Sequence, residues 1–239
     1  MVRRWELWRA LSRLNALLIA GGRRFYQPPI PNLKADRDIE YSWVAAHLPE
    51  GRGHALDFGC QGGWMALLAA RKGWETLALD QHAVSDPYVH SRLRFIQGDI
   101  LEVSLPAGHF DVVINCSTVE HVGLAGRYGV TKHRPDGDLE AMGRLKDLLK
   151  PRAIMLLTVP VGRDHVYFPL HRIYGTNRLP QLLGGWNVLK KEYWTKDSRN
   201  RWILAEEASA LDLETTDYFY GLGLFVLERP TISLENARV

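Results

Sequence analysis

A glycine-rich run follows an aspartate directly, at Asp57-Phe58-Gly59-Cys60-Gln61-Gly62-Gly63, between an expected strand and an expected helix. Glycines at the carboxyl end of a strand let the backbone turn sharply and let a ligand approach the main chain. The amino terminus of the following helix adds N–H donors. The run therefore indicates a loop that binds a small molecule, with a plain strand-to-helix turn as the alternative.

A second carboxylate, Asp80, closes the expected strand over residues 76–80. At the end of that strand it would lie beside the glycine loop, where it could accept both hydroxyls of a ribose. Nicotinamide cofactors and S-adenosylmethionine both present such a ribose. The loop separates the two, because G-x-G-x-x-G suits a pyrophosphate, whereas D-x-G-x-x-x-G suits a nucleoside without phosphates. The spacing favours S-adenosylmethionine over nicotinamide oxidoreduction.

The elements around these acids alternate between strands and helices. The strands are apolar on both faces, which is typical of a parallel sheet covered by helices on both sides. We predict helices over 35–47, 64–71, 138–150 and 175–183, and strands over 55–58, 76–80, 93–96, 111–115, 154–159, 186–194 and 221–228. The fold class is α/β, a doubly wound and mostly parallel seven-stranded sheet with a terminal antiparallel hairpin.

Composition limits the other classes of protein. The 239 residues are 46% hydrophobic and 24% charged, which excludes wholesale disorder and a polytopic membrane protein. Two cysteines, Cys60 and Cys116, are too few for a disulfide framework or a four-cysteine zinc site. We expect a cytoplasmic protein with one domain over 32–228, preceded by a helix and proline-rich linker over 1–31 and followed by a flexible tail over 229–239.

The charge is concentrated in the leading segment. Residues 1–26 hold six arginines against one glutamate, a charge of +5, so the net +3 of the chain leaves −2 for the remainder. The body is therefore not a nucleic-acid binder by composition. Residues 5–18 have the apolar spacing of an amphipathic helix. Two interpretations stay open: peripheral contact with the inner face of the membrane, or packing against the protein itself or a homodimer partner through residues 1–26.

These features resemble class I S-adenosylmethionine-dependent methyltransferases. Their first motif, usually D-x-G-C-G-x-G, is similar to residues 57–63, and their G-D after the third strand to Gly98-Asp99. Gln61 departs from the family's middle glycine, which would shift the course of the loop. The resemblance implies a Rossmann-like fold and S-adenosylmethionine as the cofactor. It implies these cofactor-binding residues: Asp57, Gly59, Cys60, Gln61, Gly62, Gly63, Asp80, Gln81, Asp99, Ile100 and Asn115.

The resemblance continues through most of the chain. Residues 118–122 are similar to the family's L-E-H-V segment after the fourth strand, and residues 171–174 to its H-x-R-x-Y stretch. More specific strings, such as His-Arg-Ile-Tyr-Gly at 171–175, resemble a family of unassigned function often associated with bacterial surface-polysaccharide genes. That association implies a small-molecule or glycan acceptor. The expected substrate-binding residues are His165, His171, Arg172 and Tyr174.

His121 is the expected catalytic base, with Glu120 beside it. Methyl transfer to a hydroxyl needs the nucleophile aligned and its proton removed. A segment after the fourth strand lies next to the cofactor, and histidine titrates near neutrality. The alternative is that Glu120 and His121 only position the loop. The polar stretch over 128–138, which includes Lys132 and Arg134, is expected to be a binding lid.

A metal-dependent mechanism is the weaker alternative. Small-RNA 2′-O-methyltransferases carry E-x-x-E-H after the fourth strand and hold magnesium with a further histidine. Here Ser117 stands at the first position, a poorer ligand than a carboxylate, so we expect no metal. Glu120, His121 and His171 would be the ligands of a divalent-metal-assisted 2′-O- or N-methyltransferase. We expect an O-methyltransferase, with a non-catalytic binding or membrane-associated scaffold as the other alternative.

Overall fold

The computed structural model describes residues 11, 13–15, 17, 18, 21, 36–85 and 87–231. Most of the expected leading helix, and residues 232–239 of the expected tail, lie outside these residues. The leading helix and its membrane or dimer contact therefore stay predictions, as do the boundaries at residues 31 and 228. None of the helices in the described part is long and apolar enough to cross a membrane.

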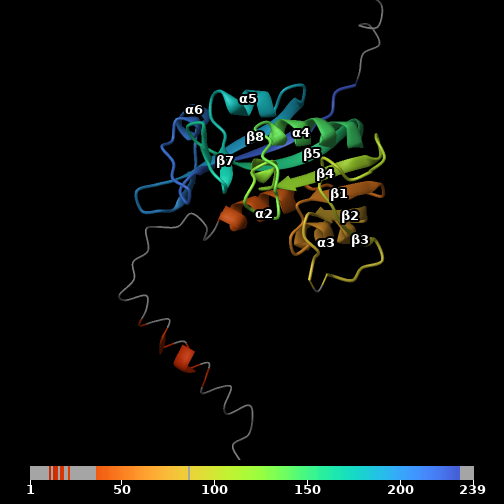
Figure 1. The fold of residues 1–239 in the computed structure, drawn as a ribbon, viewed down its shortest axis with the longest axis horizontal. Coiled ribbons are helices and arrows are strands. Elements are labelled where there is room, and N and C mark those ends of the chain that lie inside the picture. Colours follow the sequence, from red (N-terminus) through yellow and green to blue (C-terminus); the bar gives the residue numbers. More distant parts are fainter. Residues whose placement is uncertain are drawn as a thin grey trace, which may run out of the picture.

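The centre of the protein is an eight-stranded sheet in the order β3-β2-β1-β4-β5-β10-β8-β9 (Figure 1). Its strands are β1 His54–Phe58, β2 Glu75–Asp80, β3 Leu93–Gln97, β4 Phe110–Cys116, β5 Leu149–Val161, β8 Asn187–Lys196, β9 Trp202–Leu204 and β10 Gly221–Glu228. The first five are parallel, and β10 runs antiparallel between β5 and β8. The mostly parallel sheet and the β8–β10 pair are confirmed. The prediction of seven strands is wrong because the three-residue β9 adds an edge strand after β8.

The order of the strands determines where a ligand can bind. The chain enters the sheet at β1, moves outward through β2 to β3, and returns to the other side of β1 as β4. The loops that leave β1 and β4 therefore diverge, which opens a crevice at the carboxyl ends of these strands. The glycine run follows β1, and Ser117 follows β4.

Helices cover both faces of the sheet, because neighbouring residues of each strand point to opposite faces. On one face α2 (Asp36–His47) and α3 (Trp64–Arg71) pack against residues such as Val112 and Leu156. On the other face α4 (Gly137–Leu148), α5 (Arg178–Leu182) and α6 (Glu207–Leu211) pack against residues such as Val113 and Leu157. Figure 1 shows α4 and α5 at the top of the sheet, and α2 and α3 lower down, at the level of β2 and β3.

The segments after β4 and β5 contain short elements that the sequence pattern does not predict. A 3-10 turn, η1 (Val119–His121), follows β4. A separate antiparallel pair, β6 (His165–Tyr167) and β7 (His171–Ile173), follows β5. Asp136 is at the N-cap of α4, and Asp138 lies in its first turn. The Asp138 carboxylate is fully buried and accepts hydrogen bonds from Arg178 and Tyr174.

Candidate functional site

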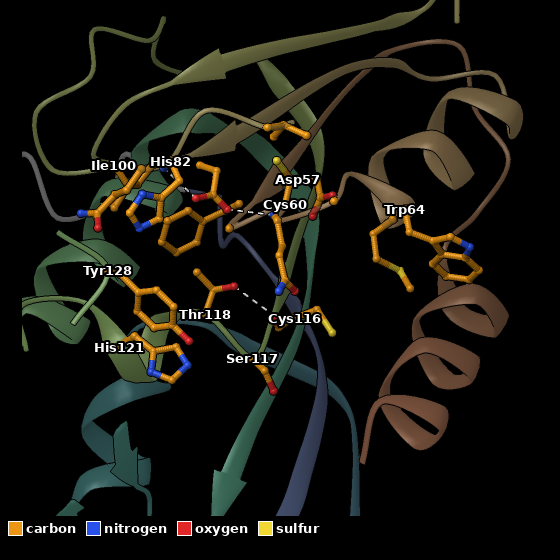
Figure 2. A pocket seen from close by; sticks show the side chains of 18 of the residues that line it. Asp57, Cys60, Trp64, His82, Ile100, Cys116, Ser117, Thr118, His121 and Tyr128 are labelled. Atoms are coloured by element: carbon orange, nitrogen blue, oxygen red, sulfur yellow. Dashed lines mark hydrogen bonds between the residues drawn. The ribbon is translucent and has the colours of Figure 1, made fainter. Parts of the chain in front are cut away.

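A pocket of about 680 Å³ lies at the carboxyl ends of the parallel strands (Figure 2). Its walls come from the loops after β1, β2 and β3, from the end of β4 with η1, and from α2. Figure 2 shows Cys60 of the glycine loop on one side and the rings of His121 and Tyr128 together on another. The pocket therefore opens where the strand order reverses, the usual place for a ligand in such a sheet.

The glycine loop turns through left-handed backbone conformations at Gly59, Gln61 and Gly63, with φ of 75°, 46° and 74°. A Cβ on Gly59 would lie 2.2 Å from the Thr118 side chain, so no larger residue fits there. A Cβ on Gly62 would meet no atom within 4 Å, because Gly62 borders the pocket. Gln61 takes a positive φ itself, so its presence in place of a glycine does not prevent the turn.

Asp80 ties the loop to the end of β2. Its Oδ2 accepts the main-chain N–H of Gln61 at 2.8 Å, and its Oδ1 accepts that of His82 at 2.9 Å. A carboxylate oxygen accepts more than one hydrogen bond, so both atoms retain capacity for a ligand hydroxyl. These main-chain donors hold the carboxylate in a fixed orientation at the pocket wall.

Asp99 is held similarly after β3. Its Oδ1 accepts the main-chain N–H of Leu101 at 2.9 Å, and its Oδ2 accepts the side-chain amide of Gln81 at 3.1 Å. Asp99, Gln81 and the largely buried Ile100 all line the pocket. Three of the expected cofactor-binding residues are thus brought together.

Asp57 lies deeper, at the end of β1. Its side chain is 2% exposed, and its Oδ2 has no hydrogen-bond partner among the described residues. Burial, together with the nearby charge of Asp80, raises the pKa of Asp57 to about 7. An unpaired buried carboxylate oxygen is costly unless a ligand supplies a donor. Since Asp57 lines the pocket, the site has an unfilled acceptor that suits an ammonium group.

His121 lines the pocket from η1, beside Tyr128 with a ring separation of 5.1 Å. Its Nδ1 lies 2.6 Å from the carbonyl oxygen of Leu170. A carbonyl only accepts, so Nδ1 carries the proton and Nε2 is the free acceptor. Burial lowers the pKa of His121 to about 3, which keeps the imidazole neutral at physiological pH.

Glu120 lies behind His121 and does not line the pocket. It is 3% exposed, and its Oε1 lies 3.7 Å from Nε2 of His121. Burial raises the pKa of Glu120 to about 8, so the two side chains meet as neutral groups at pH 7. Glu120 can influence His121, but it is not placed to touch a ligand.

Several expected site residues lie outside the pocket wall, and their positions do not match the predicted roles. Asn115 is fully buried, with its amide against the sulfurs of Met142 and Met155. Gly63 forms the turn, but the pocket does not include it. The pocket wall also lacks the four expected substrate-binding residues, His165, His171, Arg172 and Tyr174.

Those four residues have structural surroundings. Arg172 is 3% exposed and donates to the carbonyl oxygens of Glu120, Val122, Arg134 and Pro135. Tyr174 is fully buried and donates to Asp138. His171 is 7% exposed among aromatic rings, and His165 is exposed on β6 against Tyr167. Arg172 thus fastens η1 and the loop before α4, which explains its place in the motif.

The helix α2 forms a wall of the pocket that the sequence pattern does not predict. Arg37 and Tyr41 of α2 line the pocket, and Tyr41 stacks on Trp64 of α3 with ring centroids 5.3 Å apart. The feature of the sequence that points to Arg37 and Tyr41 is their four-residue spacing on the helix predicted just before the first strand. Within the described part of the chain, no group of three His, Cys, Asp or Glu residues is placed to hold a metal ion.

The comparisons with known proteins agree with this fold. A family model described as "Caenorhabditis protein of unknown function, DUF268" matches residues 69–219. No curated protein matches the chain. Among solved structures, the 1,6-didemethyltoxoflavin-N1-methyltransferase of Burkholderia thailandensis, with bound S-adenosylhomocysteine, is similar at 14% identity and a TM-score of 0.55, over 97% of this chain and 92% of that one.

Two further structures are similar. A SAM-dependent methyltransferase from Archaeoglobus fulgidus shares 15% identity with a TM-score of 0.56, over 81% of this chain and 95% of that one. The [4+2]-cyclase SpnF shares 18% identity with a TM-score of 0.56, over 80% and 81% of the two chains. At these identities the likeness establishes the fold, the Rossmann-like fold of methyltransferases. The cyclase indicates that this fold also serves a protein named for another reaction.

Proposed function

The chain belongs to the DUF268 family, whose function is unknown, and from that premise we propose that it is an S-adenosylmethionine-dependent methyltransferase. One observation carries the proposal. Three aspartates, Asp57, Asp80 and Asp99, surround the glycine loop in one pocket, each within two residues of the end of a parallel strand. An acidic pocket without a phosphate-binding pattern suits a cationic nucleoside.

The residues present fit that cofactor. The Asp80 carboxylate would accept the ribose hydroxyls, and Asp99 with Ile100 would contact the adenine. The unpaired Oδ2 of Asp57 would accept a hydrogen bond from the ammonium group. Gly62 offers bare main chain against which the ligand can lie. The bound cofactor supplies an activated methyl group on a sulfonium sulfur.

We propose O-methylation because the neutral His121 lines the pocket and, with Nδ1 bonded to Leu170, its Nε2 is the ring nitrogen that can accept a proton. In that role Nε2 would take the proton of the acceptor hydroxyl as the hydroxyl oxygen bonds to the methyl carbon, and the bond between that carbon and the cofactor sulfur would break to leave S-adenosylhomocysteine. Leu170 holds the tautomer that this step needs. His121 would thus be the catalytic residue, with Glu120 a positioning residue behind it.

The acceptor that we propose is a small molecule or a glycan. Trp64 and Tyr128 line the pocket and are 44% and 42% exposed, so each leaves aromatic surface that a ring-shaped acceptor could contact. Binding at this site does not by itself imply transfer. A methyltransferase fold without methyl transfer is the second candidate, favoured by the likeness to the [4+2]-cyclase.

A methyl-transfer screen tests the proposal. Purified protein would be incubated with S-adenosylmethionine and separate pools of sugars, nucleotide sugars and phenols, and formation of S-adenosylhomocysteine would be measured. We expect turnover above the background rate with at least one hydroxyl-bearing pool. Tight cofactor binding with no turnover on any pool would favour the second candidate.

A further inference from the structure

Arg37 places a permanent positive charge in the wall of a pocket that is otherwise acidic. Among the described residues that line the pocket, it is the only arginine or lysine. Its side chain is 42% exposed, so the guanidinium is accessible from the pocket. The three aspartates surround the glycine loop, whereas Arg37 comes from α2.

A buried carboxylate holds Arg37 in place. Nη1 of Arg37 donates to Oε2 of Glu40 at 2.8 Å, and the Glu40 side chain is fully buried. The other oxygen of Glu40 accepts the hydroxyl of Thr158 at 2.7 Å and that of Ser117. Glu40 therefore connects α2 to Ser117 after β4 and to Thr158 of β5. These bonds fix the position of the Arg37 guanidinium.

Most of the guanidinium remains available. An arginine side chain carries five N–H donors, and the bond to Glu40 is the only side-chain hydrogen bond of Arg37 within the described residues. The Arg37 charge contributes to the lowered pKa of His121 and acts on Glu120 and Cys116, which places it near η1 and the end of β4. A guanidinium with free donors in the pocket wall suits a planar or tetrahedral oxyanion.

We propose that Arg37 is an oxyanion-binding residue, which pairs with a carboxylate or phosphate group of a ligand in the pocket between α2 and η1. The oxyanion has two sources. One is the amino-acid carboxylate of S-adenosylmethionine, and this source rests on the proposed function. The other is an acidic group on the methyl acceptor.

Calorimetric titrations of Arg37→Gln, Arg37→Lys and the wild type distinguish the sources. The ligands are S-adenosylhomocysteine and 5′-methylthioadenosine, which keeps the nucleoside but lacks the amino-acid carboxylate. If the cofactor supplies the oxyanion, Arg37→Gln weakens S-adenosylhomocysteine binding roughly ten- to a hundredfold and leaves 5′-methylthioadenosine unchanged. Arg37→Lys keeps the charge but loses the paired N–H donors of the guanidinium. We therefore expect it to lose less S-adenosylhomocysteine affinity than Arg37→Gln.

A second arm uses inorganic phosphate and acetate. The rise of the melting temperature with each anion is measured at constant ionic strength, with and without S-adenosylhomocysteine. If the acceptor supplies the oxyanion, S-adenosylhomocysteine binds wild type and Arg37→Gln equally. The wild type loaded with S-adenosylhomocysteine is then stabilised by phosphate or acetate, and loaded Arg37→Gln is not.

The control is Arg163→Gln, which removes an exposed arginine paired with Asp212 and Glu214 outside the pocket. It should behave as wild type in both arms. If Arg37→Gln does not fold, Arg37→Lys decides, because it retains a partner for Glu40. Equal S-adenosylhomocysteine affinity and equal anion response in wild type and variants would overturn the proposal. A wild type that binds no S-adenosylhomocysteine refutes the proposed function, and the anion arm then decides alone on Arg37.

Discussion

Nδ1 of His121 lies 2.6 Å from the main-chain oxygen of Leu170, so a residue that precedes β7 fixes the tautomer of a residue in η1. The two residues are 49 positions apart in the sequence. The contact orients Nε2 as an acceptor, and burial keeps the ring uncharged. The β6–β7 pair thereby contributes to the site although its histidines lie outside the pocket wall.

His121→Gln should lower the rate of methyl transfer by roughly 10²- to 10⁴-fold, because the proton acceptor is lost. The affinity for S-adenosylhomocysteine should stay within about twofold, since the proposed cofactor contacts come from other residues. Single-turnover kinetics with the acceptor from the screen and calorimetry measure the two quantities. An unchanged transfer rate would show that His121 only positions the loop.

Gly62→Ala and Gly59→Ala should separate ligand contact from backbone strain. In Gly62→Ala the new methyl meets open space, so the melting temperature should hardly change while S-adenosylhomocysteine binding weakens several-fold. In Gly59→Ala the methyl collides with Thr118 at a φ of 75°, so the melting temperature should fall by several degrees. Thermal unfolding and calorimetry test both. Unchanged cofactor affinity in Gly62→Ala would mean that the ligand does not approach this main chain.

Glu120 should make the stability of the protein depend on pH. The unfolded chain ionises Glu120 above its ordinary pKa of 4.5, whereas the folded chain keeps the proton up to about pH 8. The free energy of unfolding should therefore fall as the pH rises between these values, by roughly 1.4 kcal/mol per unit for this group. Urea unfolding of the wild type and Glu120→Gln at pH 5, 7 and 9 measures the free energy of unfolding at each pH. The stability difference should shift steadily in favour of the variant, and a constant difference would contradict the burial of an un-ionised Glu120.

Arg172→Lys should destabilise the fold by about 3 kcal/mol or more. A lysine cannot reproduce the fork that donates to four carbonyl oxygens and faces the buried Asp138. Chemical unfolding measures the change, with the exposed Arg163→Lys as a control of little expected effect. A stable Arg172→Lys with impaired acceptor binding would restore the substrate-binding role that the motif suggested.

The sequence predicted most of the sheet and the pocket residues that follow β1, β2 and β3, because those features are local. Asp80 and Asp99 follow or end short apolar strands, and the carboxyl ends of parallel strands meet at one edge. The pocket wall formed by α2 and η1 was not predictable in the same way. Arg37 is held in the pocket wall by its bond to Glu40. Glu40 in turn accepts a hydrogen bond from Thr158, which is 118 residues away in the sequence. Arg172 stands in a recognisable motif, yet whether such a residue points into a pocket or into the core depends on long-range packing.

Calorimetric titration of S-adenosylhomocysteine into wild type and Asp80→Asn tests the central claim most directly. Asp80→Asn removes the charge and half of the acceptor capacity that would hold the ribose, and it also weakens the link to Gln61. We predict micromolar binding by the wild type and a loss of about tenfold or more in the variant, with the fold of both checked by circular dichroism. No binding by folded wild type at millimolar S-adenosylhomocysteine would contradict the assignment of this pocket.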